Sequence, residues 1–194
     1  MEIPSGYAQA NLRFTGTGYP TGAEITLGLD VSTYASTPDD AALDVAQSWN
    51  TVGLDAMVPA SVTLSEVAVK YGPTATGPTG IWTGTITGTR SGEQLQPGTA
   101  ILVRKITALG GKAGRGRFFH PGAIEEDTTA AGLLTSTPLA AWQSAVSDWL
   151  TTLQAADLSP VVLHGAGSPL STPTPITSFQ VDGKVATQRR RLRR

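Results

Sequence analysis

Apolar and polar residues alternate along much of the first 90 positions, which is the period of a strand with one buried face. Two such runs lie between Arg13 and Val31, and the glycine- and proline-rich residues 16–22 between them are typical of a turn. Alternation returns over residues 61–71 and again over 81–87, although the step Glu66-Val67-Ala68 breaks the strict register. The core positions that this pattern predicts are Leu12, Phe14, Ile25, Leu27, Leu29, Val31, Val62, Leu64, Val67 and Val69.

The apolar period becomes that of a helix at two places, and each begins with Ser-Thr-Pro. At the first, Thr37 can cap the helix, Pro38 suits the first helical position, and the two aspartates that follow favour the positive end of the helix dipole. We therefore predict helices near residues 38–53 and 138–155. Three tryptophans lie on the apolar stripes of these helices, and we expect each to anchor the core: Trp49, Trp142 and Trp149.

Later segments complete the predicted sheet. Residues 100–103 and 161–163 are short apolar runs typical of buried strands, and residues 176–185 form a last extended stretch. Residues 72–80 contain only glycine, proline, threonine and alanine, so they predict a surface loop. The prediction is an α+β fold with a mostly antiparallel sheet and two amphipathic helices packed on one face. One domain would span residues 1–185, and an extended arginine-rich arm would occupy 186–194.

Charge is scarce and unevenly placed. Charged residues make up 15% of the 194-residue chain, against a usual share of about 25%. Residues 1–100 hold nine acids and three bases, whereas residues 101–194 hold six acids and eleven bases. A low surface charge promotes association, and an acidic half can receive the basic half of another copy. We therefore expect a homo-oligomer.

Two short segments concentrate the positive charge, and they supply the candidate contact residues. In the first, Arg115 and Arg117 precede Phe118 and Phe119, which is the composition of a nucleic-acid contact or of a strand rim facing a neighbouring subunit. The second is the terminal arm, in which arginines suit bidentate capture of carboxylates or phosphates and Leu192 could anchor the arm in a pocket. Its candidate contact residues are Arg189, Arg190, Arg191, Leu192, Arg193 and Arg194.

The sequence leaves two kinds of partner for the arm, protein and nucleic acid. The mildly acidic pI of about 6.1 favours protein. The candidate acceptors in an adjacent copy are acids of the first half of the chain: Asp39, Asp40, Asp44 and Asp55. The alternative for this segment is a solubilising tail.

Recognisable catalytic patterns are lacking, so we expect no enzyme, catalytic residue, cofactor or metal. There is no cysteine, and the two histidines, His120 and His164, have no metal-ligand spacing. The triplet 125–127 is acidic but is typical of a solvated turn, and residues 110–113 lack the glycine and hydroxyl residue of a phosphate loop. No apolar run approaches the roughly 18 residues of a membrane span. The first six residues do not resemble a secretion signal, so we expect synthesis in the cytoplasm and no membrane partner.

The second half of the chain carries a family resemblance. The residues that carry it are Gly114-Arg115-Gly116-Arg117-Phe118-Phe119-His120-Pro121-Gly122, a tryptophan-bearing helix, Val161-Val162-Leu163, Pro173-Thr174-Pro175-Ile176-Thr177 and Thr187-Gln188-Arg189-Arg190-Arg191-Leu192-Arg193. Together they resemble virion structural proteins of tailed bacteriophages and uncultured viral genomes. The resemblance covers residues 98–194 and implies a structural subunit of a phage particle, with no enzymatic residues to carry over.

The resulting expectation is a virion structural protein, made in the bacterial host cytoplasm, that associates with itself or with other phage virion proteins. A head-to-tail charge gradient suits a closed ring and favours the tail or the head–tail junction. The alternatives are a capsid decoration protein, a nucleic-acid-binding protein that uses the arginine-rich segments, and a carbohydrate- or receptor-binding module. The last of these would use the 72–80 loop and Trp82.

Overall fold

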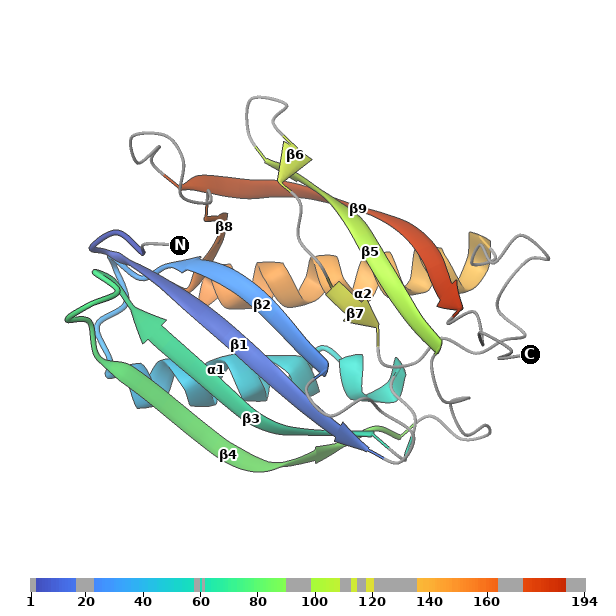
Figure 1. The fold of residues 1–194 in the computed structure, drawn as a ribbon, viewed down its shortest axis with the longest axis horizontal. Coiled ribbons are helices and arrows are strands. Elements are labelled where there is room, and N and C mark those ends of the chain that lie inside the picture. Colours follow the sequence, from blue (N-terminus) through green and yellow to red (C-terminus); the bar gives the residue numbers. More distant parts are fainter. Residues whose placement is uncertain are drawn as a thin grey trace, which may run out of the picture.

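The computed structural model describes residues 3–16, 23–57, 60, 62–89, 99–108, 113–114, 118–120, 136–163 and 173–187. Five antiparallel strands lie side by side in the order β4 (Thr79–Thr87), β3 (Val62–Tyr71), β1 (Tyr7–Gly16), β2 (Ala23–Asp30) and β8 (Ser159–Val162). Helices α1 (Pro38–Thr51) and α2 (Ser136–Ala155) lie on the same side of these strands (Figure 1). The predicted α+β fold, with two helices on one face of an antiparallel sheet, is confirmed.

The sheet continues beyond β8. Strand β9 (Thr174–Thr187) pairs with β8 near its start and then with β5 (Thr99–Ala108) along most of its length. On its other side β5 pairs with β6 (Ala113–Gly114) and β7 (Phe118–His120). Every pair among the described strands is antiparallel.

Helix α1 begins where the sequence predicts. Thr37 caps it: its side-chain oxygen accepts from the Asp40 amide at 3.2 Å, and the Asp40 carboxylate accepts from the Thr37 amide at 3.0 Å. This reciprocal pair satisfies two backbone donors that the first turn would otherwise leave without partners. The helix ends at Thr51, and Gly53 follows with a φ of 73°, a conformation that favours glycine. A short 3-10 helix, η1 (Leu54–Met57), comes next.

Helix α2 ends without a glycine. Asp157 adopts the left-handed conformation with a φ of 60°, and the Leu158 amide donates to the Leu153 carbonyl at 2.9 Å. The side chains of Leu153 and Leu158 are both fully buried. A hydrogen bond from an amide to the carbonyl five residues earlier, together with an apolar contact, is a common way to end a helix. It directs the chain from α2 into β8.

A bulge in β3 accounts for the break in its alternating pattern. Leu64 and Val67 are both buried although three positions separate them. In the pairing with β1, Leu64 lies opposite Phe14 and Glu66 lies opposite Arg13, so Ser65 is an extra residue on β3. An extra residue in one strand moves the following side chains to the other face. The break that the sequence shows around Glu66 therefore lies at Ser65.

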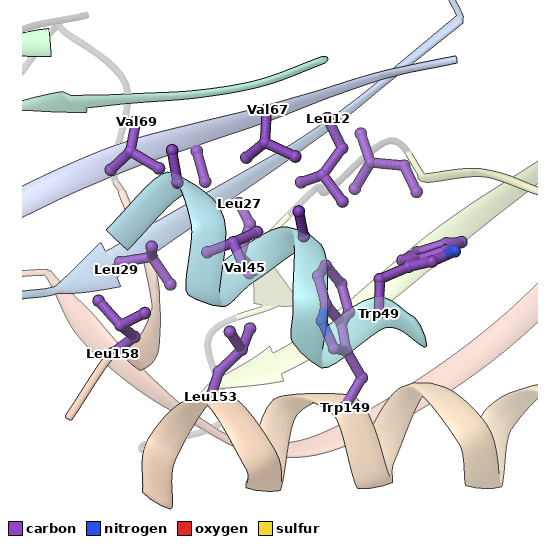
Figure 2. Close-up of a cluster of buried hydrophobic side chains, with 14 of the residues drawn as sticks. Leu12, Leu27, Leu29, Val45, Trp49, Val67, Val69, Trp149, Leu153 and Leu158 are labelled. Atoms are coloured by element: carbon purple, nitrogen blue, oxygen red, sulfur yellow. The ribbon is translucent and has the colours of Figure 1, made fainter. Parts of the chain in front are cut away.

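The core fills the space between the sheet and the helices. All ten strand positions that the sequence assigns to it are buried. Trp149 points from α2 toward α1 and toward Trp49 (Figure 2). The Trp49 ring centroid lies 5.3 Å from that of Phe14 and 5.4 Å from that of Trp149, the latter pair edge to face. Trp49 and Trp149 are thus confirmed as core anchors, whereas the side chain of Trp142 lies outside those that the structure describes.

Candidate interaction surfaces

The predicted basic contacts lie outside the described residues. This applies to Arg115, Arg117 and the whole of 188–194, so their roles stay predictions. Their surroundings are partly described. Residues 115–117 connect β6 to β7, two strands that pair with the same side of β5. The sequence predicts that the terminal arm begins at residue 186, but Ala186 and Thr187 still belong to β9, and Thr187 lies opposite Thr99 at the start of β5.

Three of the predicted acceptor acids lie in the first half of α1, and each accepts a hydrogen bond from its own chain. Asp39 accepts from the Ile81 amide at 2.9 Å, and Asp44 accepts from the Tyr34 hydroxyl at 2.8 Å. Asp40 accepts from the Thr37 amide and hydroxyl, and these bonds lower the pKa of its carboxyl. Because a carboxylate has about four acceptor sites, each acid can still receive an external donor. The side chains of Asp39 and Asp40 are exposed.

Two tyrosines lie beside these acids, and the pKa of each hydroxyl is raised. Burial, and then the hydrogen bond to Asp44, raises the pKa of the Tyr34 hydroxyl. Burial, and then the charge of Asp40, raises the pKa of Tyr71. The hydroxyl oxygen of Tyr71 is buried and has no hydrogen-bond partner among the described residues. Both tyrosines pack against the core, and the Tyr34 hydroxyl also holds Asp44 through its hydrogen bond.

Strand β4 forms one end of the described sheet and pairs only with β3 there. Its nine residues carry no charge, and most of its side chains are exposed. Ile81 is 55% exposed, and no other large apolar side chain of the described residues is exposed. Edge strands usually carry charges, prolines or bulges that prevent pairing with another chain. The outer side of β4 is therefore a candidate interaction surface.

The start of α1 lies directly against this strand. The Asp39 carboxylate reaches the Ile81 amide, as described above. A Cβ atom at Gly80 would lie 2.0 Å from the carbonyl carbon and oxygen of Pro38. Glycine is therefore required at this position to let the first turn of α1 approach the strand so closely.

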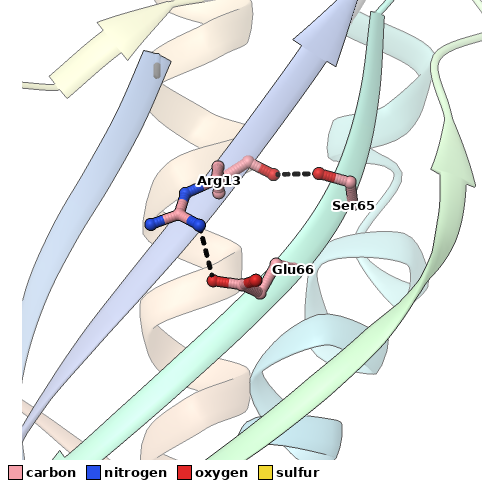
Figure 3. Close-up of polar contacts among 3 residues, drawn as sticks. All are labelled: Arg13, Ser65 and Glu66. Carbon is pink, nitrogen blue, oxygen red and sulfur yellow. Dashed lines mark hydrogen bonds and ion pairs between the residues drawn. The ribbon is translucent and has the colours of Figure 1, made fainter. Parts of the chain in front are cut away.

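Strands β1 and β3 carry polar side chains on the face of the sheet away from the helices. Arg13 forms an ion pair of 3.0 Å with Glu66, and the Ser65 hydroxyl donates to the Arg13 carbonyl at 3.2 Å (Figure 3). Nearby, the Asn11 side-chain oxygen accepts from Gln9 and Thr26, each at 3.0 Å. An antiparallel sheet commonly exposes one polar face in this way. The bonds at Ser65 and Glu66 support the bulge in β3 and form no recognisable catalytic set.

The loop between β3 and β4 is tied to the rest of the domain. The Gly72 amide donates to the Tyr7 carbonyl at 2.8 Å, the Gly77 amide donates to the Pro73 carbonyl at 2.7 Å, and the Ile3 amide donates to the Thr74 hydroxyl. The Gly72-Pro73 peptide is cis. Trp82, the aromatic residue that a receptor site would use, is half-buried and packs against the core. The arrangement thus offers this loop little of the stacking surface that sugar recognition needs.

Other chemistry finds no support in the part of the chain that the structure describes. These residues contain no group of three His, Asp or Glu side chains that could hold a metal ion. Their helices include none that is long and apolar enough to cross a membrane. No protein-family model, curated protein or solved structure matches this chain.

Sequence reasoning missed the exposed position of β4. Its alternation correctly predicts a strand, but a run without charge is more typical of the middle of a sheet than of its edge. The exposed Ile81 falls on the polar phase of that alternation, and this is the one local signal that could have indicated the outer surface.

Proposed function

We propose that this protein is a structural subunit of a bacteriophage particle that works by repeated self-association, without catalysis. Within the particle, the tail or the head–tail junction is the favoured place, and a decoration protein on the capsid is the alternative. The partners are further copies of the chain and other virion proteins.

The main support for self-association is the surface where α1 meets β4. It combines two exposed carboxylates, Asp39 and Asp40, with the exposed side chain of Ile81, and a hydrogen bond joins Asp39 directly to the Ile81 amide. The terminal arm has the complementary composition, with five arginines around the single apolar residue Leu192. Arginine pairs with carboxylates through charge-assisted hydrogen bonds. The arm of one copy therefore suits the α1–β4 surface of the next.

The geometry of such a contact is heterologous, because the donor and acceptor surfaces differ. A contact of this kind builds a ring if its rotation closes and a filament if it does not. Both are arrangements of a tubular or ring-shaped particle component. The resemblance of residues 98–194 to phage virion proteins supports placing this assembly in a virion.

The test is sedimentation velocity on the full chain and on a chain lacking residues 188–194. Five arginines lose side-chain entropy of up to about 2 kcal/mol each when they are ordered, so several contacts must form together. We expect the full chain to sediment as oligomers and the shortened chain as a folded monomer. Salt of about 0.5 M, which reduces the Debye length below about 5 Å, should act partly like the deletion.

A matched variant separates charge from geometry. Replacing the five arm arginines with lysine keeps the charge but removes the planar fork that binds a carboxylate in two places. We expect this variant to associate more weakly than the wild type and more strongly than the shortened chain. Normal assembly of the chain lacking 188–194 would show that the arm is a solubilising tail.

Nucleic acid is the rival partner because the same arginines suit phosphates. A DNA-binding protein would show an affinity that falls steeply as salt rises. We expect the full chain to bind a double-stranded DNA probe only weakly at about 0.15 M salt in fluorescence anisotropy. Tight, salt-sensitive binding that is lost with residues 188–194 would favour the rival instead.

A further inference from the structure

Successive residues of β4 direct their backbone N–H and C=O groups to opposite sides of the strand. The Ile81 amide lies on the side away from β3. In an antiparallel ladder, alternate residues direct their N–H and C=O groups toward the neighbouring strand. The Tyr71 amide of β3 donates to the Pro78 carbonyl at 2.9 Å, so residues 78, 80 and 82 face β3. Residues 79, 81 and 83 consequently face away from it. The Ile81 amide donates to Asp39 and not to a strand.

The two halves of this edge are protected in different ways. Between Leu64 and Glu66 the partner positions on β4 change from Ile86 to Thr83, so the second half contains a bulge at residues 84–85. Just beyond β4, the Thr89 amide donates to the Asp55 carbonyl of η1 at 3.0 Å. A bulge and a covered end both oppose pairing with a further strand.

The first half of the edge, Thr79–Thr83, has neither a bulge nor a covered end. From Thr79 to Thr83 its pairing with β3 is regular, with Thr79 opposite Lys70 and Thr83 opposite Glu66. These five residues carry no charge, and they contain no proline. Asp39 bonds to the amide at the centre of this segment. Its carboxylate also places a negative charge beside an edge that has none of its own.

We propose that Asp39 closes the β4 edge against antiparallel pairing with the β4 edge of a second copy. The second copy is the occupant that fits, because two uncharged Thr79–Thr83 segments meet without charge repulsion and all described strand pairs are antiparallel. A two-fold axis at Ile81 places Thr79 opposite Thr83 of the second copy and brings the two isoleucines together. Threonine pairs and pairs of β-branched side chains stabilise antiparallel strands. While the bond to Asp39 holds, the chain keeps a regular strand edge without extending its sheet.

This inference does not rest on the proposed function, and salt separates the two. Backbone pairing between neutral strands persists at about 0.5 M salt, whereas contacts of the arginine arm are weakened by screening. The experiment is therefore sedimentation velocity of the full chain at this salt concentration, over a range of protein concentrations. It compares the wild type with Asp39→Ala and with Asp39→Asn, since an asparagine oxygen can still accept the Ile81 amide.

We expect Asp39→Ala to form an additional dimer as its concentration rises, which the wild type and Asp39→Asn do not form at this salt concentration. Thr37→Ala is the matched control: it weakens the cap of the same helix but leaves the Ile81 amide closed, so it should sediment like the wild type. Adding Thr83→Pro to Asp39→Ala should abolish the dimer, because proline removes an amide that faces the second copy and is tolerated at a sheet edge. An Asp39→Ala protein that sediments like the wild type at every concentration, or an additional dimer that survives Thr83→Pro, would overturn the proposal.

Hydrogen exchange gives a second readout, because it measures the protection of single amides and not the mass of the particle. We expect the Ile81 amide to be protected in the wild type, to exchange quickly in dilute Asp39→Ala protein, and to regain protection at high concentration. The amides of Leu64 and Val67 in β3 report whether the variant remains folded. A folded Asp39→Ala protein whose Ile81 amide stays protected at every concentration would show that Asp39 does not close the edge.

Discussion

At the scale of single residues, the domain joins its two helices through a buried hydrogen bond. Ser48 of α1 is 6% exposed. Its hydroxyl accepts from the Trp149 indole N–H at 2.8 Å and donates to the Val45 carbonyl at 2.8 Å. Both polar groups are thus satisfied inside an otherwise apolar core. The sequence predicts the burial of Trp149 from its position on an apolar stripe, but the partner of its N–H depends on how the helices pack, which no local pattern contains.

Replacing Ser48 with alanine should lower the free energy of unfolding by about 1–3 kcal/mol, because the indole N–H of Trp149 then stays buried without an acceptor. Urea denaturation measures the change. Ser147→Ala, at an exposed position of α2, is the control and should stay within about 0.5 kcal/mol of the wild type. Equal stability of the two variants would show that the bond contributes nothing.

Asp40 makes the stability of α1 depend on pH. The hydrogen bonds from Thr37 lower the pKa of Asp40 in the folded state, so the folded protein binds the proton less readily than the unfolded chain. The stabilisation of the folded state by ionised Asp40 is therefore complete above the pKa of an unfolded aspartate, about 3.9. This stabilisation is lost as pH falls through the lower pKa of the folded state. Asp40→Asn should reduce the loss of stability on acidification below about pH 4, as followed by thermal denaturation. An unchanged acid dependence in that variant would contradict the assignment.

At the scale of elements, the sequence predicts the positions of helices and strands, because capping residues and apolar periodicity determine them locally. Ser-Thr-Pro starts, apolar stripes and alternation locate both helices and strands β2 to β4 within about two residues, whereas β1 begins at Tyr7, well before the predicted run that starts at Leu12. The break in β3 is visible in the sequence, yet its cause is the extra residue Ser65. The order of strands is not local, because it depends on which edges meet after long connections. The exposed position of β4 and its contact with α1 therefore could not be predicted.

The contact between α1 and β4 depends on the absence of a side chain at Gly80. Gly80→Ala would place a Cβ atom 2.0 Å from the Pro38 backbone, so the helix start must move away from the strand. We expect a loss of about 1–3 kcal/mol in the free energy of unfolding, the usual cost of overpacking. Chemical denaturation checks this, with Thr85→Ala at an exposed position of the same strand as the control. Wild-type stability of Gly80→Ala would show that α1 does not approach β4 this closely.

At the scale of the whole molecule, the acidic half of the chain holds a candidate acceptor surface where α1 meets β4. Two of the four acids that the sequence proposes as acceptors, Asp39 and Asp40, lie exposed at the start of α1, and Asp39 bonds to the Ile81 amide. Composition predicts that the two halves of the chain attract one another. It does not predict where the acceptor surface lies, because that depends on the approach of a helix to a strand some 40 residues away in sequence.

We propose that the chain is a structural part of a phage particle. Quantitative mass spectrometry of phage particles purified from cells that produce this chain tests the proposal most directly, with the major coat protein as the reference for copy number. The account predicts that the chain is present in several copies per particle and stays bound after a wash that removes loosely held proteins. Its absence from particles in which the coat and tail proteins are detected would contradict the account.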